Sequence, residues 1–457
     1  MPSLPLGPAL AVTRGTALAS RLTRRGGGTT LPGKVLSRLA PAAPSRLAAR
    51  LPRGVACVSA TNGKTTTCAM IAEIASPQLR LVRNGSGANL ASGIAAALAT
   101  RAAAQADLAL FECDEAALPG VVRDLSPHTI ALGNLFRDQL DRYGELETLA
   151  ARWRTLVAEL PLETMLVVCA DDPVAADLAD GRRRAIRYGI DDETVALDSM
   201  QHAADSRFCV RCGAPYRYAA IYLGHLGDFR CPSCGHARPP LDVLAHEIDF
   251  DGVDGVRFTL AMATEQAPVA LKVPGLYNVE NALAAAGVCL SLGFSLATIA
   301  AGLNRFTGAF GRAQRVSVGG REAVMLLIKN PAGANEVLRT LPSQGVVAHI
   351  CLNDRIADGR DVSWIWDVDW ERTADSITHV VCSGTRAVDM ALRLKYAGLE
   401  LDRIEVVDDC EAGLDRALER APAGGRVMLL PTYTAMLELQ GVFAARGLVA
   451  PYWEQSR

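Results

Sequence analysis

The stretch GVACVSATNGKTTTCAMIAEIA, residues 54–75, decides the fold of this chain. Its apolar start, residues 54–59, predicts a buried strand, and residues 65–75 are typical of a helix. The Gly-Lys pair at residues 63–64 lies in the turn between them. In such a turn, successive backbone N–H groups and the helix N-terminus can surround phosphate oxygens. The stretch therefore predicts a strand, a phosphate-binding loop and a helix, which together begin an α/β nucleotide-binding domain.

The loop at residues 60–66 assigns roles to individual side chains. Lys64 is expected to pair with the terminal phosphates of a nucleotide, and the Thr65 hydroxyl to bind the bridging magnesium ion. The expected nucleotide-binding residues of the loop are Thr61, Asn62, Gly63, Lys64, Thr65 and Thr66. Val58 stands where the full Walker pattern has glycine, so the match is partial. A chance Gly-Lys-Thr is the alternative, and the strand before the loop and the helix after it count against that alternative.

A nucleotide-bound magnesium ion also needs a carboxylate near the loop. The run ADLALFE, residues 106–112, predicts the strand of the next α/β unit, so Glu112 is expected to emerge beside the phosphate loop. We predict Glu112 as the second magnesium ligand. Asp114 and Glu115 are expected instead to cap the helix predicted at residues 114–123, because acidic residues are favoured in a first helical turn.

Strand and helix patterns alternate along most of the chain, which predicts parallel sheets covered by helices on both faces. Further strands are predicted at residues 129–133, 164–169, 324–328, 346–352, 377–382 and 427–430, and further helices at residues 145–160, 173–179 and 278–292. A chain of 457 residues is long enough for two or three domains. The Gly319-Gly320 pair interrupts the alternation, and we place a domain boundary there. The predicted divisions are a basic N-terminal segment at 1–53, a central nucleotide-binding domain at 54–318 and a C-terminal α/β domain at 319–457.

An insertion at residues 205–240 breaks this alternation and carries four of the twelve cysteines. They form two C-x-x-C pairs separated by eighteen residues: Cys209, Cys212, Cys231 and Cys234. Four thiolates at this spacing can close a tetrahedral shell around zinc, which predicts a structural zinc ribbon. A redox dithiol is the alternative, but it leaves the second pair unexplained. Nucleic-acid binding by the ribbon is a weaker interpretation, since its aromatic residues suffice as a small core.

Composition and charge exclude other classes of protein. The net charge of −2 gives no overall field for a nucleic-acid partner, and no apolar run reaches the ~18 to 20 residues of a membrane span. The cysteines outside the insertion, such as Cys57 and Cys169, lie singly in apolar contexts and are expected to be free buried thiols. This usage is typical of a reducing compartment, so we predict a cytoplasmic protein.

The first 72 residues contain no Asp or Glu and are rich in arginine. The favoured interpretation is a surface helix and linker before the first strand. The alternative is a basic patch that faces either an anionic membrane, at its inner face, or a polyanionic substrate.

Several stretches together resemble the Mur ligases and folylpolyglutamate synthase. These stretches are ATNGKTT at 60–66, NLFRDQLDRYG at 134–144, ADDP at 170–173 and GLYNVENALAA at 275–285. The zinc ribbon and LNDRIADGRDVSWIWD at 352–367 are similar to the MurT subfamily, ligase subunits of lipid II isoglutaminyl synthases that work with a glutaminase called GatD. The resemblance implies a Mur-ligase-like central P-loop ATPase domain with a parallel sheet, followed by a Rossmann-like C-terminal domain.

The resemblance also implies an activity: ATP-dependent amidation of the D-glutamate α-carboxylate of lipid II through an acyl phosphate, with ammonia from a GatD-like partner in a heterodimer. It makes Lys64 and Glu112 catalytic, makes the loop residues ATP and magnesium contacts, and adds Asn278 as an adenine contact. Arg312 would approach the nucleotide from the domain edge. Asp361 matches a ligase Asp that is thought to complete the glutaminase Cys–His pair.

This chain departs from typical Mur ligases at several positions. Gln139 replaces a magnesium-binding His, and Arg152 or Arg154 stands near the usual carbamylated Lys, which leaves the number of magnesium ions open. Two other functions remain as alternatives. One is an amino-acid-adding ligase of the Mur or folylpolyglutamate type, and the other is a zinc-ribbon scaffold with a degenerate nucleotide site.

Overall fold

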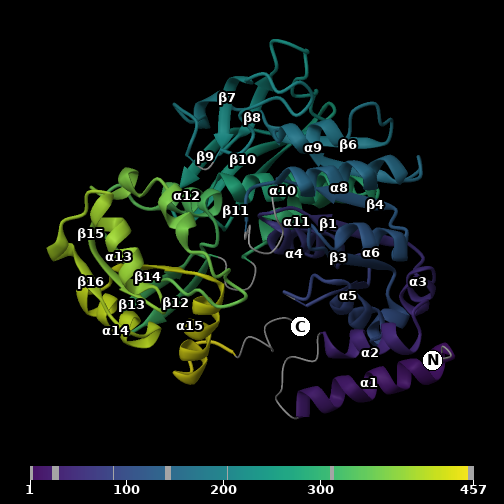
Figure 1. Cartoon of the computed structure of the whole chain (residues 1–457), viewed down its shortest axis with the longest axis horizontal. Helices are drawn as coiled ribbons and strands as arrows, with labels where there is room; N and C mark the ends of the chain where they lie inside the picture. The colour runs from purple at the N-terminus through teal and green to yellow at the C-terminus, as the bar shows by residue number, and fades with distance from the viewer. Residues whose placement is uncertain are drawn as a thin grey trace.

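The computed structural model describes residues 4–22, 30–85, 87–138, 146–202, 204–308 and 313–450. Within these ranges the chain forms a large α/β domain, a smaller C-terminal α/β domain beside it and a group of N-terminal helices at one end (Figure 1). No helix in these ranges is long and apolar enough to cross a membrane.

The large domain is built on one mixed sheet. Among the described residues, this sheet has nine strands in the order β11-β10-β9-β6-β5-β4-β1-β3-β2. The strands from β9 to β2 are parallel, and β10 and β11 extend the sheet with antiparallel pairing. Their bounds are β1 (Val55–Ser59), β2 (Leu81–Arg83), β3 (Leu108–Glu112), β4 (Thr129–Leu132), β5 (Met165–Cys169), β6 (Ala185–Ile190), β9 (Val243–Asp251), β10 (Gly255–Met262) and β11 (Glu265–Leu271).

Helices cover both faces of this sheet. One face carries α4 (Lys64–Ala75), α10 (Leu276–Ser291) and α11 (Leu296–Arg305), and the other carries α5 (Ala91–Leu98), α6 (Leu118–Leu125) and α8 (Leu146–Glu159). Along β1, Ala56 and Val58 belong to the first core, and Val55 and Cys57 belong to the second. A central parallel strand is apolar on both sides for this reason. The short helix α9 (Pro173–Leu178) follows β5.

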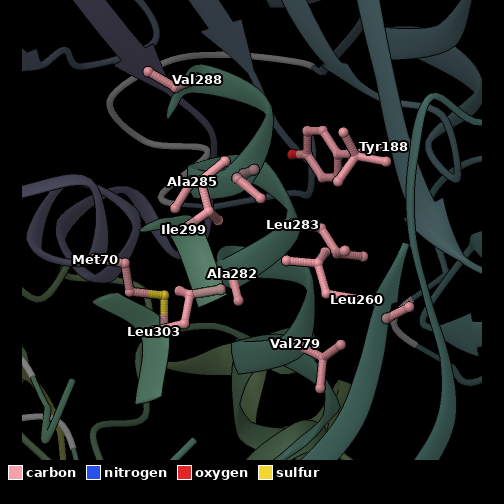
Figure 2. Close-up of a cluster of buried hydrophobic side chains, with 14 of the residues drawn as sticks. Met70, Tyr188, Leu260, Val279, Ala282, Leu283, Ala285, Val288, Ile299 and Leu303 are labelled. Atoms are coloured by element: carbon pink, nitrogen blue, oxygen red, sulfur yellow. The ribbon is translucent and has the colours of Figure 1, made fainter. Parts of the chain in front are cut away.

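Helix α10 lies at the centre of the first core (Figure 2). Ala282 and Ala285 lie on the side of α10 that carries Met70 of α4 and Ile299 of α11, and Leu283 lies on the side of Leu260 of β10. Almost every α10 residue from Leu276 to Cys289 is buried, which small side chains make possible because they let neighbouring helices approach closely. The N-terminus of this well-packed helix lies next to the phosphate loop.

The N-terminal segment folds as helices: α1 (Leu6–Leu22), α2 (Leu31–Leu39) and α3 (Ala43–Ala48). Helix α2 packs directly on α5, since a Cβ atom added at Gly33 would lie 1.6 Å from the backbone oxygen of Ser92. A small apolar cluster that includes Leu36 and Ala95 holds them together. The described part of this segment thus forms three packed helices, where a single surface helix and a linker were expected.

The C-terminal domain has a second sheet, in the order β12-β13-β17-β14-β15-β16 within the described residues. Its strands are β12 (Gln314–Val318), β13 (Arg321–Met325), β14 (Val346–Cys351), β15 (Ile377–Ser383), β16 (Ile404–Val406) and β17 (Arg426–Pro431). Its helices are α12 (Pro331–Thr340), α13 (Ala387–Tyr396), α14 (Cys410–Arg420) and α15 (Tyr433–Ala445).

Both domains also contain short 3-10 helices. They lie at Ala102–Gln105 (η1) and Glu193–Val195 (η2) in the large domain, and at Ser363–Asp367 (η3), Trp370–Thr373 (η4) and Leu401–Arg403 (η5) in the C-terminal domain.

The predicted domain boundary at residue 318 needs a correction. Strand β12 pairs antiparallel with β13, so it belongs to the C-terminal sheet. Gly319 and Gly320 both have positive φ and form the turn of this hairpin. The glycine pair therefore marks a turn inside the second domain, which includes the chain from Gln314 onward.

The expectation that all cysteines outside the insertion are free is also wrong for one pair. Cys351 at the end of β14 and Cys410 at the start of α14 form a disulfide across 59 residues of sequence. Cys57, Cys169, Cys289 and Cys382 are free and buried, as expected. The pairing was not predictable because no local motif links two residues so far apart.

Leu283→Ala should lower the free energy of unfolding by about 3 kcal/mol, because Leu283 is 0% exposed and its loss leaves a cavity beneath α10. Chemical denaturation followed by circular dichroism measures the change. Leu162→Ala is the matched control, since Leu162 is 80% exposed and should change stability by less than about 0.5 kcal/mol. Equal effects of the two substitutions would contradict the central position of α10.

Candidate active site

The phosphate loop connects β1 to α4 as predicted. Gly63, the residue before α4, has φ of 89°, a left-handed conformation that glycine adopts without strain. A Cβ atom at this position would also lie 1.8 Å from Oδ1 of Asn281. Glycine is therefore required both by the backbone and by the close approach of α10.

Lys64 is buried at the head of α4. Its Nζ donates to Oε2 of Glu115 at 2.8 Å and to the backbone oxygens of Ala60 and Thr61. Burial alone would lower the pKa of Lys64, but the carboxylates of Glu115 and Glu112 outweigh it and raise the pKa above its ordinary value. Lys64 thus presents a permanent positive charge to the loop.

The capping role expected for Glu115 is therefore wrong. Asp114 accepts hydrogen bonds from the backbone N–H groups of Ala116 and Ala117, at 3.1 and 3.3 Å, but these lie in the turn before α6, which begins at Leu118 and has no side-chain cap. Glu115 instead turns inward to Lys64. Adjacent acidic residues before a helix give the same sequence signal, and only the direction of each side chain separates a cap from a charge partner.

Thr65 and Glu112 are brought together. Strand β3 pairs in parallel with β1, with Glu112 opposite Val58, and the Thr65 hydroxyl donates to Oε2 of Glu112 at 2.9 Å. A hydroxyl and a carboxylate are the oxygen ligands that magnesium accepts when substrate phosphates complete its shell. These two residues fit a magnesium–nucleotide site.

The segment after β4 holds the phosphate loop in shape. Asn134 accepts two hydrogen bonds from the loop. Its backbone oxygen accepts one from the N–H of Thr61 at 2.8 Å, and its side-chain Oδ1 accepts one from the N–H of Asn62 at 2.9 Å. The Thr61 hydroxyl accepts the N–H of Phe136 at 3.0 Å. Thr61 therefore supports the loop, and its hydroxyl is already engaged.

The C-terminal domain reaches the loop with residues that the sequence did not single out. Lys329 Nζ donates to the backbone oxygen of Thr61 at 2.9 Å and to Oδ2 of Asp138 at 2.6 Å. The Asn330 amide donates to Oδ1 of Asn62 at 3.0 Å. Asn330 also caps α12 by accepting the N–H of Gly333, and the Asn330-Pro331 pair was a readable helix-start signal.

A cavity of about 90 Å³ lies between the two domains and adjoins the phosphate loop. From the loop side it is lined by Asn62, Gly63 and Thr66, and α10 contributes Tyr277, Glu280 and Asn281. Asn278, the expected adenine contact, is buried beside it and donates to the Pro274 oxygen at 2.7 Å. Asn281 donates to Asn278 Oδ1 at 3.2 Å, so Asn278 supports a residue that lines the cavity.

Glu280 is a buried carboxyl in the wall of this cavity. Burial raises the pKa of Glu280 to about 8, and the nearby Asp171 carboxylate adds to this shift. The Cys169 thiol donates a hydrogen bond to Oε1 of Glu280 at 3.1 Å, which opposes the shift. Glu280 is therefore protonated at neutral pH. The helical sequence around it gave no sign of this, because burial depends on how α10 packs.

Asp361 lies on an exposed loop of the C-terminal domain that follows β14. Ser363 donates its backbone N–H to Oδ1 at 2.8 Å, and the Ser363 hydrogen bonds lower the pKa of Asp361 below its usual value. The same loop is fastened by Asp358, which accepts a hydrogen bond from the backbone N–H of Thr434 at 2.7 Å.

Three other positions were singled out in the sequence. Arg312 and Gln139 lie outside the described residues, and Arg154 forms an ion pair with Asp177 at 3.3 Å.

The insertion brings its four cysteines together. All four Sγ atoms lie within 4.8 Å of one another, and the Cys209–Cys234 and Cys212–Cys231 pairs are 3.5 Å apart. A zinc ion with Zn–S bonds of ~2.3 Å in a tetrahedron places sulfur atoms about 3.8 Å apart. The donor set and its separations therefore fit a closed metal site.

Two protein families match parts of the chain. The family described as Mur ligase middle domain matches residues 58–230, and the family described as MurT ligase C-terminal matches residues 327–436. The first range contains the phosphate loop and most of the insertion. The second contains Lys329 and the Asp361 loop.

Curated relatives cover nearly the whole chain. The lipid II isoglutaminyl synthase (glutamine-hydrolyzing) subunit MurT of Staphylococcus aureus (strain N315) is 30% identical over 431 residues, covering 92% of this chain and 94% of that protein. The protein of the same name from Streptococcus pneumoniae (strain ATCC BAA-255 / R6) is 31% identical over 435 residues, covering 94% and 95%.

Solved structures share the fold at low sequence identity. A pseudomurein peptide ligase type C from Methanothermus fervidus has a TM-score of 0.67 at 21% identity, covering 86% of this chain and 78% of that one. MurF ligase from Thermotoga maritima in complex with ADP has a TM-score of 0.64 at 12% identity, covering 91% and 84%.

Glu280→Gln should gain stability relative to wild type as pH rises. Unfolded Glu280 loses its proton near pH 4.5, whereas the folded residue keeps it until about pH 8, so this carboxyl destabilises the wild-type fold increasingly between those values. The difference should grow by about 4 kcal/mol between pH 5 and pH 8.5, measured by denaturant unfolding. Exposed Glu163→Gln serves as control, and a pH-independent difference for Glu280→Gln would contradict the raised pKa.

Proposed function

Because this chain belongs to the MurT family of Mur ligases, we propose that it amidates the α-carboxylate of D-glutamate in lipid II to give D-isoglutamine, using ATP. The observation that carries the proposal is similarity along almost the full length of both chains to lipid II isoglutaminyl synthase subunits. The loop at residues 60–66, with its lysine, threonine and nearby carboxylates, supplies the site that such a ligase needs.

The chemistry follows from the charge arrangement around the loop. A carboxylate is a poor acyl donor, and phosphorylation by ATP to an acyl phosphate supplies it with a leaving group that ammonia then displaces. Lys64 and the backbone N–H groups of the loop would neutralise charge on the transferring phosphoryl group. Thr65 and Glu112 would hold the magnesium ion. Glu115 keeps the Lys64 ammonium charged and fixed at the head of α4.

A second subunit is part of the proposal, because the sequence has no Gly-x-Cys-x-Gly motif for a glutaminase nucleophile. A partner glutaminase of the GatD type would release ammonia from glutamine. Asp361 is exposed, and the hydrogen bonds from Ser363 lower its pKa further below its ordinary value, so the side chain is a carboxylate at neutral pH. Such a carboxylate can orient and stabilise the histidine of a partner's Cys–His pair.

Asp361→Asn should lower glutamine-driven amidation about 100-fold or more, because an amide cannot stabilise a charged histidine, while ammonium-driven amidation stays within about twofold of wild type. The measurement is ATP-dependent amidation of a lipid II analogue by the chain with a candidate glutaminase, with either nitrogen donor. Asp402→Asn, on another exposed segment of the same domain, should change neither rate.

Three further outcomes separate the possible functions. Lys64→Ala should abolish amidation with both donors. Equal loss of both activities in Asp361→Asn would remove this residue from the glutaminase triad. A wild-type chain that forms no amide, but releases phosphate when an amino acid is supplied, would instead identify an amino-acid-adding ligase.

We also propose that Cys209, Cys212, Cys231 and Cys234 hold one structural zinc ion. The insertion has only a small core, in which Tyr216 and Phe229 pack with ring centroids 5.2 Å apart. Metal binding can stabilise such a fold because the closed site forms only on folding.

Cys212→Ser should reduce the zinc content from one ion per chain to well below one and lower the unfolding temperature by roughly 5 °C. Elemental analysis and thermal unfolding measure these two effects. Ser233→Ala, within the second cysteine pair's turn, is the control that should retain the zinc. Full zinc occupancy in Cys212→Ser would contradict a four-thiolate site.

A further inference from the structure

The hairpin of the four-cysteine insertion reaches the cavity beside the phosphate loop. It consists of β7 (Arg217–Leu223) and β8 (Leu226–Arg230), which pair antiparallel (Figure 1). Leu223 and Leu226, the two residues that flank its turn, line the cavity and are 5% and 0% exposed. The end of the hairpin away from the cysteines is thus buried at the interface of the two domains.

The turn is held firmly by the large domain. The N–H of Gly224 donates to Oε1 of Gln201 at 2.9 Å, and the N–H of Gly227 donates to the backbone oxygen of Asp171 at 2.9 Å. Gly224 has φ of 57°, and a Cβ atom there would lie 2.7 Å from the Phe136 ring. The turn therefore lies directly against the segment that shapes the phosphate loop.

His225, between the two leucines, fixes the turn further. It is fully buried, its ring lies 4.5 Å from that of Phe136, and its Nδ1 accepts the N–H of Asp205 at 3.3 Å. Its Nε2 lies 3.6 Å from Oδ2 of Asp172. The same oxygen accepts the N–H of Leu135 at 2.8 Å, so one carboxylate connects the turn to the segment after β4.

The C-terminal domain closes the other side. Arg339 of α12 donates to the backbone oxygen of Tyr222 at 2.7 Å and to that of Val195 at 3.2 Å. Leu326 and Val337 of the same domain line the cavity with the leucines of the turn. The cavity consequently has a polar end at the phosphate loop and an apolar wall to which the hairpin turn contributes.

We propose that the turn of the insertion, through Leu223 and Leu226, forms the apolar wall against which the adenosine of bound ATP packs. The inference rests on the proposed function, because it takes the phosphates of ATP to lie on the loop at residues 60–66. Thr66, one residue beyond the expected magnesium ligand, lines the same cavity, so the cavity continues from the phosphate loop. Apolar walls with a few polar groups are typical of small-molecule sites.

The insertion is then a determinant of nucleotide affinity as well as a self-contained metal site. A purely structural hairpin would stabilise the fold without distinguishing one loop ligand from another. A wall for adenosine would instead affect the affinity for ligands that carry a nucleoside. It would leave the affinity for ligands that consist only of phosphates unchanged. The two roles therefore make different predictions for ATP and inorganic triphosphate.

Leu226→Ala should weaken ATP binding about 10-fold, because apolar contact with the nucleoside is lost, and leave the affinity for inorganic triphosphate within about twofold of wild type. Isothermal titration calorimetry of the full chain with magnesium present measures both affinities. Ile221→Ala is the matched control, since Ile221 lies on the same strand but does not line the cavity, and it should change neither affinity.

Leu223→Phe is a second variant that removes no core volume and places a larger side chain at the cavity wall. It should weaken ATP binding with triphosphate binding and unfolding temperature retained. Unchanged ATP affinity in both variants, or equal weakening of ATP and triphosphate, would overturn the inference alone. A wild-type chain that binds neither ligand would overturn the proposed function together with it.

Discussion

A buried positive charge that must always have a negative partner is the constraint on which this site depends. An ammonium group removed from water is costly unless a charge and hydrogen bonds replace its hydration. Lys64 meets this requirement with Glu115 and two backbone oxygens of its own loop. When the phosphates of ATP bind, the Lys64 ammonium would already be oriented by its ion pair with Glu115. Strand β3 is central to this arrangement because Glu112 ends it and Glu115 follows it closely.

The second domain takes part in the same network. Lys329 and Asn330 contact the phosphate loop at Thr61 and Asn62 through hydrogen bonds between 2.6 and 3.0 Å that also include Asp138. The candidate active site therefore lies between the two domains, and residues of both domains line its cavity. Solved ligase structures at 21% and 12% identity share the overall fold of these domains.

The sequence predicted the parts of the site that depend on local order. The phosphate loop, the strand that ends at Glu112 and the four grouped cysteines each have their chemistry within a short stretch, and the structure places them as expected. The parts it missed depend on tertiary packing. Glu115 turns inward to Lys64, the packing of α10 buries its own residue Glu280, and Lys329 reaches the phosphate loop from the other domain. The glycine pair at residues 319–320 was misread because a hairpin turn and a linker use the same residues.

Arg339 has a mechanical consequence for this enzyme. Its guanidinium group bonds to the carbonyl oxygens of Tyr222 in the hairpin and Val195 in η2, and it also pairs with Glu336 of its own helix at 3.2 Å. Any movement that separates the C-terminal domain from the hairpin would have to break these two bonds, in addition to those of Lys329 and Asn330 to the phosphate loop. One side chain of the C-terminal domain is thereby bonded both to the hairpin, beside its turn and away from the four cysteines, and to the large domain.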